Sequence, residues 1–297
     1  AVSCRGPAAS PAAGLADFAD RIVTDQRAPG VVIAHGKGEG AAAFFARGTL
    51  AFDCKHAADQ DTLWRIYSMT KPIAGMAAMI LVSENKLKLD QPVADFIPAF
   101  AKIKVSVDGM GLQSVPAKTP VTIRHLLTHT SGLIYGEFTS SPISDAYLQL
   151  GVHPLQTSRA DQSPVAPSLA EFAERVAALP LVCEPGTNWV YGVGLDVLGR
   201  VIEVASGEAF DQFLKRRIFD PLDMRSTFFT VPQAQANRLA TSYERKRFSV
   251  DVLDPAPASV YLRTPPFPFG GSGLVSSARD YDRFLAMVGN RGMLGGA

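Results

Sequence analysis

The sequence predicts an α/β (α+β) fold in which one sheet-bearing domain is interrupted by a mainly helical domain. Strand-like apolar runs stand near both ends of the chain, amphipathic helical patterns fill its middle, and there is no internal repeat. The 297 residues, 47% of them hydrophobic and 19% charged, are enough to bury a large core. We expect a flexible lead-in over 1–14, the sheet-bearing domain over 15–67 and 205–297, and the helical domain over 68–204.

The N-terminal elements are predicted to be a helix and a β-hairpin. In "LADFADRIVTDQ", Leu15, Phe18 and Ile22 lie on one helical face. The runs "GVVIAHGKGEG" and "AAAFFARGTLAF" indicate two strands joined by a glycine-rich turn. Gly36, Gly38 and their neighbours also fit the loose dinucleotide-binding pattern G-x-G-x-x-A. No helical pattern follows those glycines, so the hairpin is favoured over a nucleotide site.

The next predicted element is a helix over 68–89, in "SMTKPIAGMAAMILVSENKLKL". A helix tolerates proline only in its first turn, so Pro72 places the start of this helix close to Ser68. The apolar residues that follow occur almost all round the helix, which indicates that it runs through the interior.

The remaining segments are predicted from turn and cap signals. A hairpin is expected around the Asp108-Gly109 turn, a loop over the Ser- and Pro-rich residues 140–167, and a helix capped by Ser168 with Glu171. The other expected elements are helices in "TIRHLLTH", "GLDVLGRVIEVAS" and "AFDQFLKRRIFDPL", strands in "RLATSYERK" and "SVYLRT", and a last helix capped near Ser277.

Charge and composition argue against several classes of function. The net charge is +1 and no basic run could follow a phosphate backbone, so no nucleic-acid partner is expected. No stretch of about 20 apolar residues could span a membrane. Cys4, Cys54 and Cys183 are scattered, and His125 and His129 lack the H-E-x-x-H pattern. We therefore expect no disulfide framework, no metal site and no cofactor.

The segment "RIYSMTKPI" places Ser68 and Lys71 three residues apart at the start of the predicted helix. Positions i and i+3 share a helix face, so the lysine nitrogen can reach the serine hydroxyl. The positive end of the helix dipole and burial both oppose protonation of that amine. A neutral lysine could accept the serine proton as the serine attacks. S-x-x-K also occurs by chance and serine is a common helix cap, so an ordinary helix start stays open on this motif alone.

Five sequence motifs occur in a fixed order between about residue 15 and the end of the chain. They are "RIYSMTKPI", "LVSENKLKLDQPVADFIPAF", "VTIRHLLTHTSGL", "EPGTNWVYGVGLDVLGRVIE" and "GGSGLVSSARDYDRFLAMVGNRG". Together they resemble the β-lactamase-related serine hydrolases: class C β-lactamases, D-alanyl-D-alanine carboxypeptidases and family VIII carboxylesterases. The resemblance implies a β-lactamase/transpeptidase-like fold, with an antiparallel sheet flanked by helices, an all-helical domain, and the active site at their interface.

The resemblance also implies the roles of three residues. Ser68 matches the nucleophile that forms the acyl-enzyme, and Lys71 matches its partner in S-x-x-K. Tyr191, in "WVYGVG", matches the tyrosine that shuttles the serine proton; the alternative is a core tyrosine beside Trp189. The "HTSGL" segment that begins at His129 is expected to be a structural loop near the site.

Two departures from the family pattern refine the prediction. Penicillin-recognising members usually carry Tyr-x-Asn, whereas the third position here is Val193, and "YGVGLDVLG" looks like the esterase branch. The family's third motif (Lys-Thr-Gly, His-x-Gly or a Trp-Gly-Gly variant) belongs on a strand after the last helix, and the chain reaches Ala297 before any such strand. We therefore expect the C-terminal strands to be missing here and the natural protein to continue.

The resemblance implies a serine esterase that hydrolyses small carboxylic esters through an acyl-enzyme on Ser68, with Lys71 and Tyr191 as proton-transfer groups. A β-lactamase or D-alanyl-D-alanine carboxypeptidase is the nearest alternative. An acyltransferase and a non-catalytic binding protein of the same fold also remain open. The sequence indicates neither an oligomeric state nor a compartment, and a cytoplasmic, periplasmic or secreted bacterial protein fits equally.

Overall fold

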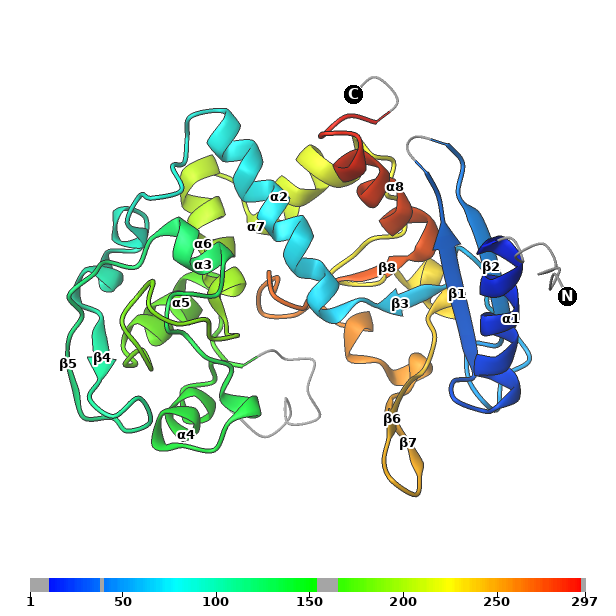
Figure 1. Cartoon of the computed structure of the whole chain (residues 1–297), viewed down its shortest axis with the longest axis horizontal. Helices are drawn as coiled ribbons and strands as arrows, with labels where there is room; N and C mark the ends of the chain where they lie inside the picture. Colours follow the sequence, from blue (N-terminus) through cyan, green and yellow to red (C-terminus); the bar gives the residue numbers. More distant parts are fainter. Residues whose placement is uncertain (1–10, 38–39, 154–164, 295–297) are drawn as a thin grey trace, which may run out of the picture. The chain divides into compact units, whose positions relative to one another are not determined.

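The fold is mixed α and β, as the sequence predicts. A computed structural model describes residues 11–37, 40–153 and 165–294 (Figure 1). The helices are α1 (Pro11–Thr24), α2 (Thr70–Ser83), α3 (Ile123–Leu127), α4 (Pro142–Gln149), α5 (Leu169–Ala177), α6 (Gly194–Ser206), α7 (Phe210–Leu214) and α8 (Ala278–Gly289). The strands are β1 (Gly30–His35), β2 (Ala43–Gly48), β3 (Leu63–Arg65), β4 (Lys104–Ser106), β5 (Ser114–Pro116), β6 (Ser242–Arg245), β7 (Val250–Asp254) and β8 (Val275–Ser277).

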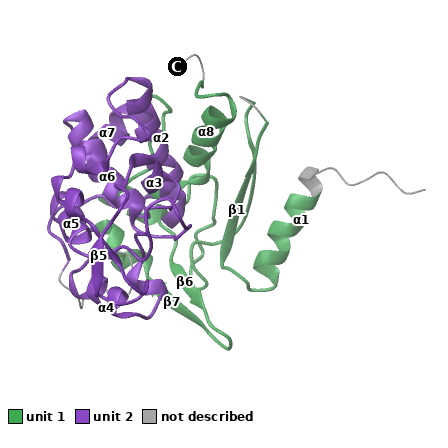
Figure 2. Cartoon of the chain, turned by 60° about the vertical axis from the view of Figure 1, so that its left-hand side comes forward, with its two compact units in different colours: residues 1–65, 221–262, 275–297 green, residues 66–220, 263–274 purple. Residues whose placement is uncertain are grey.

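The chain divides into two compact units, coloured separately in Figure 2. Unit 1 comprises residues 1–65, 221–262 and 275–297, and unit 2 comprises residues 66–220 and 263–274. Residues 205–220 and 263–274, both expected in the sheet-bearing domain, cluster with unit 2. The first segment does so because α6 runs on to Ser206 and α7 packs against α2 and α6. The second is bonded to the start of α2, since the Leu274 N–H donates to Thr70 Oγ1.

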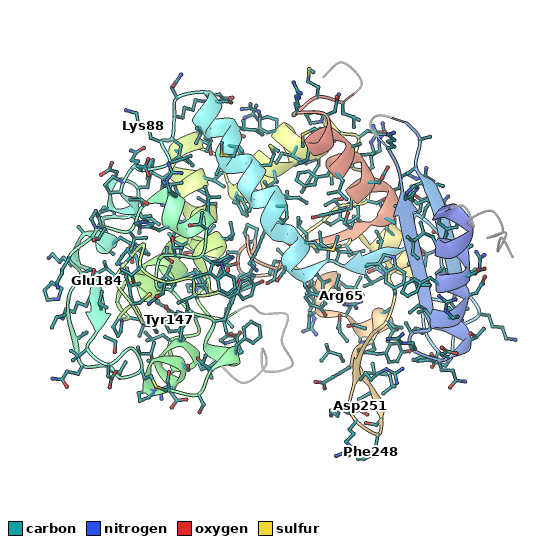
Figure 3. All side chains as sticks on the ribbon, viewed as in Figure 1. Arg65, Lys88, Tyr147, Glu184, Phe248 and Asp251 are labelled. Carbon is teal, nitrogen blue, oxygen red and sulfur yellow. The ribbon has the colours of Figure 1, made fainter. Side chains whose placement is uncertain are left out.

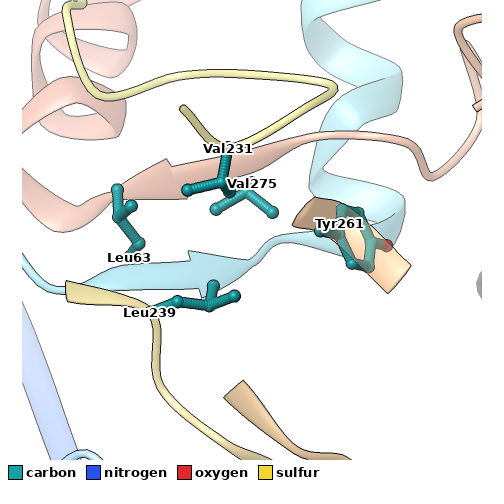
Figure 4. Close-up of a cluster of buried hydrophobic side chains, with 5 residues drawn as sticks. All are labelled: Leu63, Val231, Leu239, Tyr261 and Val275. Carbon is teal, nitrogen blue, oxygen red and sulfur yellow. The ribbon is translucent and has the colours of Figure 1, made fainter. Parts of the chain in front are cut away.

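The described residues of unit 1 form three antiparallel strand pairs, β1–β2, β3–β8 and β6–β7. The predicted N-terminal hairpin is confirmed: β1 and β2 pair from Gly30 opposite Gly48 to His35 opposite Ala43. Helices α1 and α8 both contact β1 (Figure 1). A buried apolar cluster joins the second pair to its loops (Figure 4); it consists of Leu63, Val231, Leu239, Tyr261 and Val275.

Unit 2 is mainly helical and is built around α2 and α6, which pack against each other. Helices α3 and α5 contact α6, and α7 contacts both central helices. The predicted hairpin at the Asp108-Gly109 turn is confirmed as β4 paired with β5. The predicted N-cap of α5 is also confirmed, because Ser168 Oγ accepts a hydrogen bond from the Glu171 N–H at 3.2 Å.

Helix boundaries differ from the prediction at two places. Helix α1 begins at Pro11 rather than at Leu15, since proline is tolerated at a first helical position and the next two residues are alanines. The predicted lead-in residues 1–10 lie outside the described part of the chain. Helix α2 ends at Ser83 rather than at residue 89, because Asn85 adopts a left-handed conformation with φ of 56°.

Two segments have a different secondary structure from the prediction. Within the expected loop 140–167, Pro142–Gln149 forms α4, whose N-cap Ser141 accepts a hydrogen bond from the Ser144 N–H. "SVYLRT" is not a strand, because Val260–Leu262 forms a 3₁₀ turn and the partner of β6 is Val250–Asp254. None of the helices in the described ranges has the length and apolar character needed to cross a bilayer.

Candidate active site

Ser68 lies in a strained turn at the mouth of α2. Tyr67–Met69 forms a single 3₁₀ turn that runs directly into the helix, and Tyr67 has φ of 41°, which is uncommon for a residue with a side chain. The turn is tied to the segment 263–274, because the Ile66 N–H donates to Leu274 O at 3.0 Å and the Leu274 N–H donates to Thr70 Oγ1 at 3.1 Å. Ser68 itself is exposed.

Lys71 contacts the serine from the first turn of α2. Its Nζ donates to Ser68 Oγ at 3.1 Å and to the carbonyl oxygen of Gly271 at 2.7 Å. The same nitrogen lies 4.6 Å from the centre of the Tyr191 ring. The spacing of three residues therefore places the lysine where the sequence predicts, and the second bond fixes the direction of its side chain.

Tyr191 reaches the serine from 123 residues farther along the chain, with its Oη 2.5 Å from Ser68 Oγ. The extended segment that carries it is held by His129, whose carbonyl accepts from the Val190 N–H at 2.7 Å and whose Nδ1 accepts from the Gly192 N–H at 3.4 Å. Gly192 has no room for a side chain, since a Cβ there would lie 2.1 Å from Leu133 O.

The structure thus brings the three predicted site residues into one hydrogen-bonded group within unit 2. Ser68 Oγ lies between the lysine nitrogen and the tyrosine oxygen. This arrangement places a nucleophilic hydroxyl between two groups able to take up and return its proton. Val193, which stands where an asparagine would mark a penicillin-recognising site, is fully buried.

A buried carboxylate behind this group is not predicted by the sequence. Asp196, in the first turn of α6, is 1% exposed; its Oδ1 accepts from the Gly271 N–H at 2.8 Å and its Oδ2 accepts from the Tyr135 hydroxyl at 3.3 Å. A Cβ on Gly271 would lie 2.4 Å from Tyr135 Oη, so only glycine fits. Because Gly271 also accepts from Lys71, the carboxylate holds the backbone unit that orients the lysine.

Burial sets the protonation of the groups around the three site residues. Burial raises the pKa of Asp196 to about 6, and it raises the pKa of Tyr135 well above its usual range. Burial, with a smaller effect of the Lys71 charge, lowers the pKa of His129 to about 4. His129 is therefore neutral near pH 7, which fits its role as a hydrogen-bond acceptor for the Gly192 N–H.

The sequence carried one signal for Asp196: a carboxylate flanked by leucine and valine at the start of an apolar helix. No comparable signal marks Tyr135 or Gly271, whose importance comes from tertiary contacts. Within the described ranges, no group of three or more histidine, cysteine, aspartate or glutamate side chains is arranged to hold a metal ion.

Known proteins with similar sequences and structures point to one family. Residues 15–297 match the Beta-lactamase family. The chain is 36% identical to protein Rv1367c of Mycobacterium tuberculosis over 242 residues, which cover 80% of this chain and 56% of that protein. It is 34% identical to esterase EstB of Burkholderia gladioli over 251 residues, which cover 79% of this chain and 59% of EstB.

A solved structure agrees with the sequence matches. EstCE1, described as a hydrolase with promiscuous acyltransferase activity, aligns with a TM-score of 0.79 at 25% identity, covering 96% of this chain and 74% of EstCE1. The chain spans little more than half the length of the two curated relatives, 56% and 59%. It has the β-lactamase/transpeptidase-like fold that its motifs imply, and it belongs to the Beta-lactamase family of serine hydrolases.

Proposed function

We propose that this chain carries the acyl-enzyme-forming site of a carboxylesterase of the family VIII type. The observation that supports the proposal most directly is the position of Ser68 Oγ, which lies 2.5 Å from Tyr191 Oη and 3.1 Å from Lys71 Nζ. A relative named as an esterase supports the substrate class. Val193 in place of an asparagine amide argues against β-lactam recognition.

In the proposed acylation step, Ser68 Oγ attacks the ester carbonyl carbon and its proton passes to the pair formed by Lys71 and Tyr191. The Ser68 N–H, at the start of the turn that leads into α2, is a donor for the negative charge on the carbonyl oxygen. Lys71 Nζ is tied to the Gly271 carbonyl, so we assign proton donation to the leaving alcohol to Tyr191. Water then attacks the acyl group by the reverse proton path.

The test is to label and assay the purified full-length protein. We expect a fluorophosphonate probe to form an adduct on Ser68, and p-nitrophenyl esters of short acids to be hydrolysed faster than a chromogenic cephalosporin. Ser68→Ala should abolish both labelling and hydrolysis. Lys71→Ala and Tyr191→Phe should each lower kcat by about 10²- to 10⁴-fold, the usual contribution of a proton-transfer group.

Each alternative predicts a different result in the same assays. An active protein that hydrolyses the cephalosporin in preference to the esters would favour the β-lactamase. Absence of a Ser68 adduct in a folded protein would favour a binding role and would rule out the esterase.

A further inference from the structure

Two further aromatic rings, called here the outer rings, stack against the ring of Tyr191, and the mechanism above uses only Tyr191. The ring centre of Phe138 lies 6.4 Å from that of Tyr191, with 20° between the ring planes. The ring centre of Trp189 lies 6.1 Å from that of Tyr191, with 23° between the ring planes. The outer rings come from separate segments, Phe138 from the turn Gly136–Phe138 and Trp189 from the extended segment before α6.

The two outer rings are open to solvent. Phe138 is 72% exposed and Trp189 is 68% exposed, whereas Tyr191 is half-buried. Single exposed apolar side chains are common on proteins, but two large exposed rings that both stack against the ring of a site residue offer a surface for a ligand. Aromatic faces favour stacking with other flat rings, which adds to the gain from burying their area.

The position of the outer rings indicates which part of an ester they contact. Tyr191 Oη lies 2.5 Å from Ser68 Oγ, and the proposed function assigns this oxygen to protonation of the leaving alcohol. The groups beside Tyr191 therefore lie next to the alcohol part of the substrate, rather than next to the acyl part.

Neither outer ring carries a charge. Lys71 Nζ lies 4.6 Å from the Tyr191 ring and 5.2 Å from the Tyr135 ring, and the Asp196 carboxylate accepts from the Tyr135 hydroxyl, so a basic and an acidic group lie together and favour neither a cationic nor an anionic alcohol. His129 packs edge-on against Trp189, with ring centres 6.0 Å apart. These contacts leave the flat faces of neutral rings as the main recognition feature.

We propose that Phe138 and Trp189 form an alcohol-side subsite for neutral aromatic alcohols, which serve as the leaving group in acylation and as an acyl acceptor in competition with water. This inference rests on the proposed function. In the transfer step, the alcohol oxygen bonds to the acyl carbon and the bond from that carbon to Ser68 Oγ breaks. The alcohol proton passes through Tyr191 and Lys71 to Ser68 Oγ, so the enzyme is restored.

The first test measures partition of one acyl-enzyme between acceptors. The protein is acylated with a p-nitrophenyl ester in the presence of benzyl alcohol or ethanol, and the ratio of the two transfer products is measured. We expect Phe138→Ala and Trp189→Ala each to lower the benzyl-to-ethanol ratio by about 3- to 10-fold, as expected for loss of one stacking partner. Trp189→Phe should restore most of the ratio.

The ratio separates binding from a purely structural role, because damage to the site lowers transfer to both acceptors equally. Phe248→Ala is the matched control, since Phe248 is an 89% exposed aromatic residue of unit 1 between β6 and β7 (Figure 3). It should leave the ratio unchanged. A benzyl-to-ethanol ratio that changes by less than twofold in both outer-ring variants would overturn the subsite.

A second test does not depend on catalysis. Ser68→Ala protein is titrated with 2-naphthylmethanol, and binding is followed by calorimetry. We expect saturable binding that weakens by at least about threefold when Trp189→Ala or Phe138→Ala is added. If wild-type protein forms no Ser68 adduct and yet Ser68→Ala protein binds the naphthyl alcohol in this way, the esterase proposal fails and the subsite stands. Equal affinity in all variants contradicts the subsite alone.

Discussion

Asp196 is the residue whose environment differs most from that of an ordinary aspartate. It is buried, it accepts hydrogen bonds from the Gly271 N–H and the Tyr135 hydroxyl, and burial raises its pKa to about 6. Through Gly271 it orients Lys71 without touching Ser68. Asp196 therefore acts on the site by holding other groups in position. Its ionisation should affect the free energy of unfolding.

Replacement of this carboxylate should change how stability depends on pH. Between pH 4 and 6 the folded protein retains a proton on Asp196 that the unfolded chain has released, so the contribution of Asp196 to the free energy of unfolding falls as the pH rises. The total is about 3 kcal/mol for a pKa that moves from the ordinary 3.8 to about 6. Urea titrations at pH 4, 5, 6 and 7 should show Asp196→Asn gaining stability relative to wild type over that range.

The exposed Asp145 provides the matched control, because Asp145→Asn removes the same charge from the first turn of another helix, α4. The free energy of unfolding of Asp145→Asn should change with pH in the same way as that of the wild type. A constant difference between Asp196→Asn and wild type at every pH would show that the buried carboxylate does not titrate in this range.

His129 should have the opposite effect on stability. Its pKa is lowered to about 4, so between pH 6.5 and 4 the unfolded chain takes up a proton that the folded protein excludes, and stability falls as the pH falls. His129→Asn should reduce this loss of stability on acidification, since asparagine tolerates the φ of 55° at this position and retains an acceptor for Gly192. Urea midpoints that decline as steeply as in wild type from pH 6.5 to 4 would contradict this.

At the scale of elements, periodicity and caps predicted most of the helices, because those signals are local. Helix α8 is capped by Ser277 as expected, with Ser277 Oγ accepting from the Asp280 N–H at 3.2 Å. The helix α4 was missed, although Ser141 and Pro142 are cap signals, because the Ser- and Pro-rich composition around them indicated a loop.

The strand predicted in "SVYLRT" failed for a tertiary reason. Asp254, at the end of β7, accepts from the Val260 N–H at 3.2 Å and from Ser259 Oγ at 2.7 Å, which folds that segment into a turn. Tyr261 is thereby placed in the buried cluster of unit 1. Neither contact can be read from a local pattern.

The same Asp254 forms the main ion pair of this region. Arg65, at the end of β3 (Figure 3), pairs with Asp254, and the two side chains are only 3% and 12% exposed. Arg65 also donates to Ser259 Oγ at 3.0 Å. Removal of one partner leaves an unpaired buried charge, so Arg65→Met should destabilise the protein by about 3–5 kcal/mol in urea unfolding.

The paired variant distinguishes charge from packing. Arg65→Met combined with Asp254→Asn should recover at least half of the loss, because no buried charge then lacks a partner and the asparagine oxygen can still accept from the Val260 N–H. Arg124→Met, which breaks a surface pair with Asp90, should cost less than about 1 kcal/mol. A loss for Arg65→Met no greater than that of the surface variant would show that the buried pair contributes little.

At the scale of the whole molecule, the sequence predicted the class of fold and brought Ser68, Lys71 and Tyr191 forward as candidates. The first two follow from helix geometry over three residues, whereas the tyrosine depends on a resemblance, since no local rule joins positions 123 residues apart. The hydrogen bonds of Asp196 with Tyr135 and Gly271 could not be predicted, because a hydrogen bond between distant residues leaves no periodic pattern in the sequence.

The reacting groups and their supports come from four separate stretches of chain, yet every one of them belongs to unit 2. The hydrogen bonds around the serine are therefore contained within that unit. Substitutions at exposed positions of unit 1 should alter the surface charge and leave the proposed proton path unchanged, so the two properties should be separable.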